Sequence, residues 1–136
     1  MYDPEMVQPM RDEATRMGLQ ELKTPADVES ALNKPGITLI LVNSVCGCAA
    51  GGARPGLRLS LMNGKKPANL YTVFAGMETQ ATEKAREFFK PYRPSSPQIA
   101  ILKDGKLVKM VQRQDIEGRQ PADVAKSLVE AFNEYC

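Results

Sequence analysis

The sequence predicts a single α/β domain, residues 1–136, in which helices flank both faces of a central mixed β-sheet. Segments rich in β-branched and aliphatic residues alternate with segments of helical periodicity, a pattern typical of parallel strands joined by right-handed crossovers. Near the C-terminus, two short apolar runs flank Asp104-Gly105, a hairpin signal that adds antiparallel neighbours to the sheet. The length of 136 residues suits one domain with one sizeable core.

The first predicted element is a helix that begins at Asp3-Pro4. Asp3 is a suitable N-cap, and Pro4 suits the first helical position. Pro9 predicts a kink or a later start, because a proline inside a helix removes a backbone hydrogen bond. The apolar stripe expected to face the core consists of Met6, Met10, Ala14 and Met17.

The next elements lead to the strongest strand. Residues 19–22 are expected to form a short, weak strand. Thr24-Pro25 marks the start of a second helix, with Thr24 as its N-cap, and Pro35-Gly36 follows its end. Ile37–Val42 is almost continuously aliphatic and β-branched, which is typical of a strand covered on both faces.

The rest of the chain alternates in the same way. A helix over residues 49–61 contains several glycines and a proline, so we expect a kinked or late start. A second strong strand over 70–75 precedes a helix capped by Thr79. That helix is expected to bury Ala81, Ala85, Phe88 and Phe89. After a proline-rich loop come the hairpin strands, 98–102 and 106–111, and a last helix that begins near Pro121.

Composition excludes several classes of function. A net charge of +2 argues against a dedicated nucleic-acid-binding protein, and no apolar run approaches the ~20 residues that a membrane span needs. The charged N-terminal segment does not resemble a secretory signal, so we expect a cytoplasmic protein with reduced thiols at rest. There is no histidine, which excludes Cys–His and Ser–His catalysis and metal sites that need imidazole.

The candidate catalytic residues are Cys46 and Cys48, which flank Gly47 where the apolar strand hands over to a helix. Free amides at a helix N-terminus stabilise a thiolate, the form that attacks disulfides. A turn at Gly47 would bring the two α-carbons within the about 4.4–6.8 Å that a disulfide requires. We expect Cys46, the more exposed of the two, to attack a mixed disulfide and keep the adduct. Cys48 or an external thiol would then release it.

Candidate substrate-binding residues surround this pair. From residue 46 to residue 66 the chain has four basic residues, beginning with Arg54, and no acidic one. Such a segment lowers a thiol pKa and attracts an anionic substrate, or it is simply a solvated helix face. Gly47 is a further candidate substrate-binding residue, and the small residues of the following helix would let a partner backbone approach the cysteines or simply allow tight packing of the helix on the sheet. Pro97 precedes a strand and could be a cis proline that leaves the backbone of Ser96 free to pair with an extended substrate, or an ordinary trans loop proline.

Residues 42–51, VNSVCGCAAG, together with Ala53-Arg54-Pro55, resemble the bacilliredoxin family of low-GC Gram-positive bacteria. The resemblance extends over essentially the whole chain, through Phe74-Ala75-Gly76, Pro94-Ser95-Ser96-Pro97, Ile116-Glu117-Gly118 and Cys136. It implies a thioredoxin-like fold with Pro97 at the cis-proline position. It also implies that Cys46 removes bacillithiol, a small thiol co-substrate, from S-bacillithiolated proteins, with Cys48 as the second thiol and no further cofactor. The one-residue spacer and the lack of a preceding Trp favour monothiol-type exchange over general dithiol reduction.

Two other functions remain open. Cys46, Cys48 and Cys136 could hold zinc or an iron–sulfur cluster with an outside fourth ligand, which would make the protein a metal carrier. Alternatively, the chain could be an interaction domain without catalysis. Cys136 itself could be a third redox partner, an intermolecular bridge or an incidental terminal residue.

Overall fold

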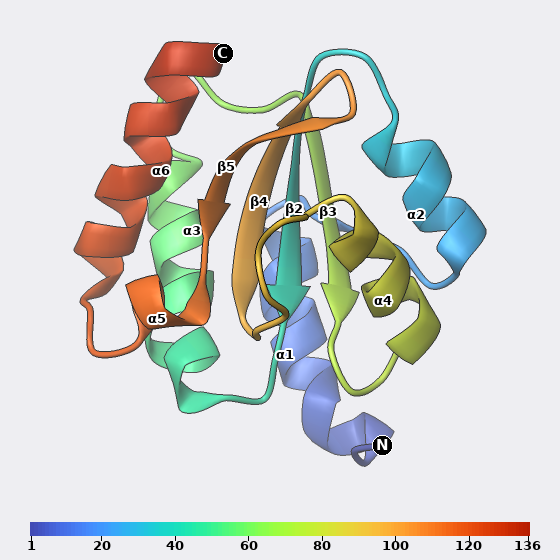
Figure 1. Cartoon of the computed structure of the whole chain (residues 1–136). Helices are drawn as coiled ribbons and strands as arrows, with labels where there is room; N and C mark the ends of the chain where they lie inside the picture. The colour runs from blue at the N-terminus through green and yellow to red at the C-terminus, as the bar shows by residue number, and fades with distance from the viewer.

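The computed structural model describes residues 1–136 and contains a five-stranded mixed sheet in the order β1-β3-β2-β4-β5 (Figure 1). β3 pairs in parallel with β1 and β2, whereas β4 is antiparallel to β2 and β5. The predicted mixed sheet and closing hairpin are confirmed. The strands are β1 (Gln20–Glu21), β2 (Ile37–Asn43), β3 (Asn69–Phe74), β4 (Gln98–Lys103) and β5 (Lys106–Val111).

Helices cover both faces of the sheet (Figure 1). One face packs against three helices, α1 (Pro4–Arg16), α3 (Arg54–Ser60) and α6 (Pro121–Tyr135). The other face packs against α2 (Pro25–Leu32) and α4 (Thr79–Glu87). A short helix, α5 (Arg113–Ile116), connects β5 to α6 and was not predicted. No helix combines the length and the apolar character that crossing a bilayer would require.

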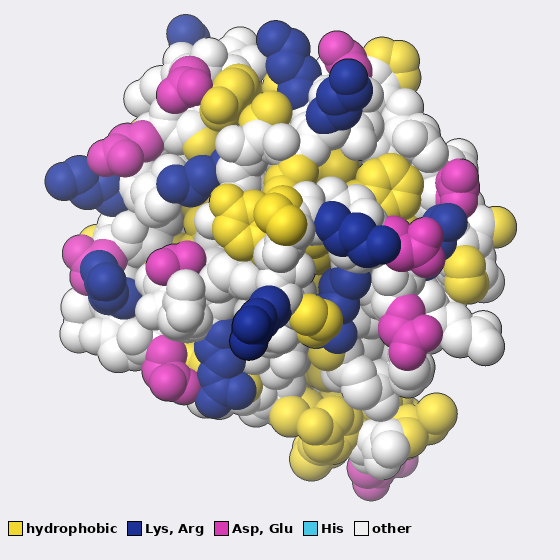
Figure 2. All heavy atoms as spheres, in the orientation of Figure 1, with side chains coloured by type: hydrophobic (Ala, Val, Ile, Leu, Met, Phe, Trp, Pro, Cys, Tyr) yellow, Lys and Arg dark blue, Asp and Glu magenta, His cyan; other side chains and the backbone are white.

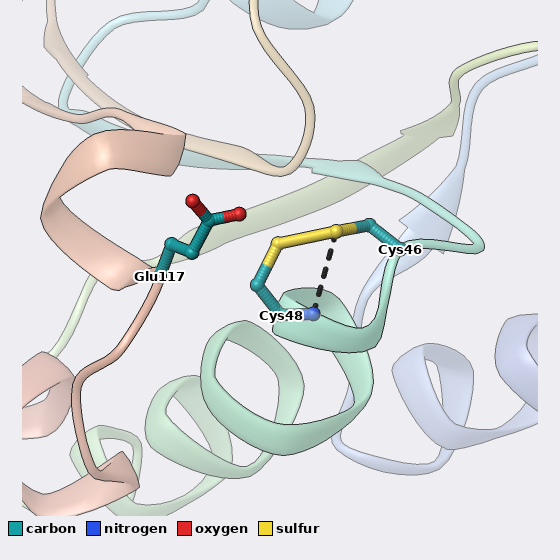
Figure 3. A group of neighbouring side chains, drawn as sticks. All are labelled: Cys46, Cys48 and Glu117. Atoms are coloured by element: carbon teal, nitrogen blue, oxygen red, sulfur yellow. Dashed lines mark hydrogen bonds between the residues drawn. A yellow bond between two sulfur atoms is a disulfide. The ribbon is translucent and has the colours of Figure 1, made fainter.

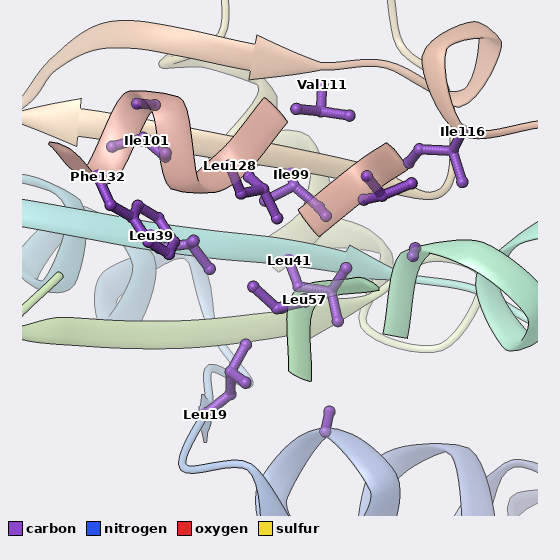
Figure 4. Packing of buried hydrophobic residues seen from close by; sticks show 14 residues of the cluster. Leu19, Leu39, Leu41, Leu57, Ile99, Ile101, Val111, Ile116, Leu128 and Phe132 are labelled. Carbon is purple, nitrogen blue, oxygen red and sulfur yellow. The ribbon is translucent and has the colours of Figure 1, made fainter. Parts of the chain in front are cut away.

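The central strand β2 is buried on both faces, as its composition predicts. Leu39 and Leu41 pack in the cluster under α1, α3 and α6, which Figure 4 shows, and Ile40 and Val42 pack in the cluster under α2 and α4. All four side chains are fully buried. Each such side chain contributes about 1.5–3 kcal/mol through the hydrophobic effect. The segment that follows β2 therefore begins at a firmly anchored point.

The predicted inner face of α1 is right in part. Ala14 is buried and Met17 packs against the core, whereas Met6 is 48% exposed and Val7 and Arg11 are buried in addition. Arg11 lies on the inner face, where it donates from Nη1 and Nη2 to the two carboxylate oxygens of Glu78 at 2.9 and 2.7 Å. An apolar stripe read from the sequence cannot register such a pair.

Proline and capping details also differ from the prediction. α1 is continuous from Pro4 to Arg16, with Pro9 inside it on the exposed side, where water can reach the carbonyl group that loses its partner. The N-cap of α4 is Glu78, not Thr79, and makes no side-chain capping bond. Its carboxylate is held by Arg11 instead.

Basic and acidic side chains are interspersed on the face of the molecule drawn in Figure 2 and form no large patch of one charge. Apolar side chains gather on that face near the N-terminus, where Met1, Tyr2 and Met6 are exposed. This distribution agrees with the small net charge of +2.

Candidate active site

Cys46 occupies the N-cap of the helix that follows β2. Helical backbone begins at Gly47 and includes a π-helical turn, Ala49–Ala53, before α3. The carbonyl oxygen of Cys46 accepts hydrogen bonds from the amides of Ala49 and Ala50 at 2.9 and 3.3 Å. The amide of Cys48 donates to the Cys46 Sγ at 3.4 Å, so this sulfur takes the place of an N-cap side-chain oxygen. The irregular helix start expected from the glycines is present as the π-helical turn.

Cys46 and Cys48 form a disulfide with a Cα–Cα distance of 5.3 Å, within the range predicted for the pair. Both cysteines are half-buried and Gly47 is exposed. Cys48, predicted to be the more shielded, packs against the core cluster under α1, α3 and α6. The hydrogen bond from the Cys48 amide to the Cys46 sulfur also distinguishes them. A Cβ at position 47 would meet no atom within 4 Å, so the space beside Gly47 is open.

Arg54 lies beneath the cysteine turn and not in contact with solvent. Only 3% of this residue is exposed. Its Nε donates to Glu13 Oε1 at 2.7 Å, and its Nη1 donates to Asn43 Oδ1 at 2.8 Å and to the Ser44 carbonyl oxygen at 3.0 Å. The predicted role of Arg54 in substrate binding is therefore corrected. Its guanidinium group donates hydrogen bonds to polar groups at the C-terminal end of β2 and to Glu13.

These hydrogen bonds continue to the cysteine. Asn43 Oδ1 also accepts from the Ser44 amide at 2.9 Å, and the Asn43 side chain donates to the Met10 carbonyl oxygen at 3.1 Å. Ser44 Oγ accepts from the Cys46 amide at 3.0 Å. The turn that presents Cys46 is thus tied to α1 and α3 through side chains that are themselves buried.

The other basic residues of segment 46–66 do not gather around the disulfide. Lys65 follows the far end of α3, at the opposite end of the molecule from the end of β2 (Figure 1). Instead, two arginines from another part of the chain, Arg113 and Arg119, line the cleft beside the cysteines. The basic residues beside the cysteines are therefore not those that the sequence suggested, and Arg113 forms an ion pair with Glu117 in the same cleft.

The disulfide lines an open cleft of about 480 Å³, whose second wall comes from α5 and the loop after it. This wall consists of Arg113 and residues 116–119. Gly52 allows it to approach, because a Cβ at Gly52 would lie 2.8 Å from the Cγ2 of Ile116, which is 1% exposed. Sequence reasoning missed this wall as part of the site. Its only signal was the Ile116-Glu117-Gly118 match in the family resemblance.

Glu117 points its carboxylate toward the disulfide, on the side of the Cys48 sulfur (Figure 3). A carboxylate oxygen and the two sulfurs all lie within 4.8 Å of one another. Arg113 donates to Glu117 Oε2 from Nη2 at 2.9 Å and from Nε at 3.2 Å. With both cysteines reduced, these three groups could also serve as ligands to a metal ion.

Cys136 is not part of this arrangement. The π-helical turn packs against the start of α6, and Cys136 follows the last residue of that 15-residue helix, about 22 Å further along its axis (Figure 1). Burial raises the pKa of the Cys136 thiol, partly opposed by the charge of Lys65. The predicted three-cysteine metal set is therefore not assembled within one chain.

Ser96 and Pro97 lie at the same end of the sheet as the cysteines but do not line the cleft. The Ser96–Pro97 bond is cis, and the pairing of Val42 with Gln98 places Pro97 beside Asn43, at the end of β2. The backbone of Ser96 makes no hydrogen bond within the protein. The preceding residue is held in place, because the Ser95 carbonyl oxygen accepts from Arg86 Nη2 at 2.8 Å.

Comparison with known sequences gives full-length matches. A family model described as Disulphide isomerase matches residues 2–136. A bacilliredoxin of Cytophaga hutchinsonii is 52% identical over 134 residues, which cover 98% of this chain and 99% of the relative. A bacilliredoxin of Geobacillus kaustophilus is 50% identical over 132 residues, covering 97% of this chain and 91% of the relative.

Comparison with solved structures finds the thioredoxin fold. The oxidized mitochondrial thioredoxin 3 of Saccharomyces cerevisiae superposes with a TM-score of 0.58 at 12% identity, covering 90% of this chain and 98% of that one. Thioredoxin of Fasciola hepatica gives a TM-score of 0.57 at 16% identity, covering 87% and 100% of the two chains. These likenesses confirm the fold predicted from the sequence.

Proposed function

Because the chain belongs to the bacilliredoxin family of thiol–disulfide oxidoreductases, we propose that it removes bacillithiol from proteins that carry this small thiol in a mixed disulfide. The observation that carries the proposal is the position of the Cys46 sulfur. It sits at a helix N-cap, accepts an amide hydrogen bond and lines an open cleft. An amide donor at a helix N-terminus favours the thiolate, which is the nucleophile in disulfide exchange.

In the first step, the Cys46 thiolate attacks the bacillithiol sulfur of the mixed disulfide. A bond forms between Cys46 Sγ and bacillithiol, and the bond between bacillithiol and the client protein breaks. The client cysteine leaves as a thiolate and takes a proton from water. The open cleft leaves room for the small thiol beside Cys46, and Arg119 supplies positive charge for an anionic one, since the charge of Arg113 is already paired with Glu117.

In the second step, the thiol of Cys48 attacks Cys46 Sγ and expels bacillithiol. The product is the Cys46–Cys48 disulfide, the state that the present structure contains. Alternatively, a second small thiol attacks the adduct on Cys46 and releases it without this disulfide. A Cys48-independent route of this kind is the monothiol-type exchange that the one-residue spacer favours.

The client protein is expected to bind beside Pro97. The unpaired backbone groups of Ser96 can form β-sheet hydrogen bonds with an extended segment, and Ser96 lies at the same sheet end as Cys46. Such contacts recognise the backbone of the client protein and do not depend on its sequence. They would suit an enzyme that acts on many S-bacillithiolated proteins.

A mass measurement tests the proposal directly. Reduced Cys48→Ala protein is mixed with a client carrying a bacillithiol mixed disulfide, and the peptides are analysed without reduction. We expect a mass increase equal to one bacillithiol on the Cys46 peptide. An adduct on Cys136, or full activity of a Cys46→Ala variant, would contradict the proposed role of Cys46.

A metal-carrier function is the second candidate, and Glu117 is the observation that favours it. Two thiolates and one carboxylate within 4.8 Å resemble a three-ligand set with an open fourth position. Metal analysis of protein purified without chelator separates the two functions. Stoichiometric zinc or iron that is lost in the Cys48→Ala variant would support metal binding, and metal-free protein with exchange activity would support the oxidoreductase alone.

A further inference from the structure

We propose that Glu117 is the base that accepts the proton of the Cys48 thiol while this thiol attacks the adduct on Cys46. The inference rests on the proposed function, because it concerns the second step of that cycle. It assigns a catalytic role to a residue on the far wall of the cleft, which lies 69 positions after Cys48 in the sequence.

The two sulfurs have different surroundings. Cys46 Sγ accepts a hydrogen bond from the Cys48 amide, whereas Cys48 Sγ accepts none and faces the carboxylate of Glu117 (Figure 3). An amide donor stabilises a thiolate, and a carboxylate disfavours one. In the reduced protein, these surroundings favour the thiolate form of Cys46 and the thiol form of Cys48. Cys48 must therefore lose its proton during the reaction.

Glu117 is held in a position where one of its oxygens is free. Arg113 donates both of its hydrogen bonds to Oε2, whereas Oε1 has no hydrogen-bond partner in the protein. One carboxylate oxygen of Glu117 lies within 4.8 Å of both sulfurs. A small side-chain rotation or one bridging water would complete a path for the proton from Cys48. The contact between Gly52 and Ile116 fixes the loop that carries Glu117.

The step balances without another reactant. The Cys48 thiol gives its proton to the Glu117 carboxylate as its sulfur bonds to Cys46 Sγ. The bond between Cys46 Sγ and the small thiol breaks, and the electron pair leaves with the small thiolate. This thiolate takes the proton from Glu117, which returns to the carboxylate form. Cys48 is oxidised and the small thiol is reduced, whereas Cys46 keeps the disulfide oxidation state that it reached in the first step.

The two steps of the cycle should depend differently on Glu117. Attack by Cys46 uses the sulfur that the Cys48 amide stabilises as a thiolate, so we expect it to need no base. Resolution by Cys48 needs a base, and positioned bases typically contribute 10²–10⁴-fold. Loss of the carboxylate should therefore slow resolution and leave the first step almost unchanged.

Stopped-flow kinetics with Ellman's reagent separate the steps, in a Cys136→Ala background. The first equivalent of coloured thiolate reports attack by Cys46, at a rate that depends on reagent concentration. The second equivalent reports resolution by Cys48, at a rate that does not. The coloured leaving group needs no protonation, so the second phase measures proton loss from Cys48. Glu117→Gln is the test variant, and Glu130→Gln, an exposed carboxamide substitution on α6, is the matched control.

At pH 7 we expect Glu117→Gln to slow the second phase by at least tenfold and to change the first phase by less than twofold. Between pH 6 and pH 8 the second phase should be nearly constant in the parent protein. In Glu117→Gln it should rise about tenfold per pH unit, because Cys48 then ionises only through bulk water. Added formate should restore the second phase in Glu117→Ala, which a structural role of Glu117 would not allow.

Three results would overturn the proposal. A second phase that is unchanged or faster in Glu117→Gln would mean that the carboxylate only keeps Cys48 protonated. Equal slowing of both phases would indicate a structural role. A pH profile of the same shape in both proteins would exclude proton transfer to Glu117. Because the reagent is not bacillithiol, these results stand even if bacillithiol proves not to be the substrate.

Discussion

Replacing Arg54 with alanine tests whether the buried hydrogen bonds behind the cysteine turn hold Cys46 in place. The substitution removes three hydrogen bonds made by a charged donor, to Glu13, Asn43 and the Ser44 carbonyl oxygen. Arg54 is 3% exposed, so water cannot readily take over the role of its guanidinium. The three partners differ in what they lose.

The expected cost follows from these partners. The side chain of Glu13 is 36% exposed and regains water, so its bond contributes little to the balance. Asn43 Oδ1 keeps the Ser44 amide as a donor. The Ser44 carbonyl oxygen is left without its donor, which costs about 1–3 kcal/mol, and the packing of the Arg54 stem is lost as well. We therefore expect about 3 kcal/mol of destabilisation.

Thermal unfolding of the reduced protein measures this cost. With an unfolding entropy of about 2.1 cal/mol/K per residue, 3 kcal/mol lowers the Tm of a chain of 136 residues by about 10 °C. Arg58→Ala is the matched control, because Arg58 is exposed on the same helix and should change stability by less than about 0.5 kcal/mol. The alkylation rate of Cys46 should also fall in Arg54→Ala.

Arg54→Lys refines the test, because lysine keeps the charge but not the geometry of three separate bonds. We expect a stability between those of the alanine variant and the parent. A Tm for Arg54→Ala within 2 °C of the parent, with unchanged alkylation of Cys46, would refute the reasoning that this residue positions the turn.

Three further predictions concern other parts of the molecule. Gly52→Ala places a Cβ 2.8 Å from Ile116 Cγ2, so it should lower the free energy of unfolding in chemical denaturation by about 1–3 kcal/mol. It should also slow the attack of Cys48 on the adduct, because it displaces the loop that forms the second wall of the cleft. Wild-type stability together with a wild-type rate would contradict this packing. Burial raises the pKa of Cys136, so less of it is thiolate near neutral pH than in a free cysteine. Its alkylation at pH 7.5 should be slower than that of a cysteine peptide and should accelerate as the pH rises. A rate above that of the peptide would refute the shift. Glu78→Gln leaves Arg11 buried with a weakened partner and should cost about 3 kcal/mol. The hydrogen bonds that Arg11 donates to Glu78 raise the pKa of Arg11, so Arg11 stays charged and the loss should be independent of pH between 6 and 9. A Tm unchanged within 2 °C would contradict it.

Local signals account for what the sequence predicted correctly. The aliphatic run of β2, the Thr24-Pro25 start of α2 and the Asp104-Gly105 hairpin each encode their structure within a few residues. The position of Cys46 follows from the same kind of signal, because it lies where a strand ends and a glycine-rich helix begins. These features need no knowledge of the remaining chain.

Contacts between distant segments account for what was missed. Arg54 was expected at the surface because arginine is usually exposed, and only the fold brings Glu13 and Asn43 close enough to bury it. α5 has only four residues and shows no helical periodicity, so nothing local indicated that Glu117 would face the disulfide. Burial of charge and assembly of a cleft are properties of tertiary structure.

The one-residue spacer gives Cys48 two separate tasks. Because Cys46 is the N-cap, the amide that reaches its sulfur belongs to the second residue after it, which in this spacing is the second cysteine itself. In the proposed cycle, the backbone of Cys48 would thus activate the first thiol, while its side chain would resolve the adduct. Alanine at this position keeps the amide and removes only the sulfur. Cys48→Ala should therefore retain a reactive Cys46 and still fail to form the internal disulfide, so that the adduct is trapped on Cys46. Cys48→Pro lacks the amide as well as the sulfur, and it should not trap the adduct.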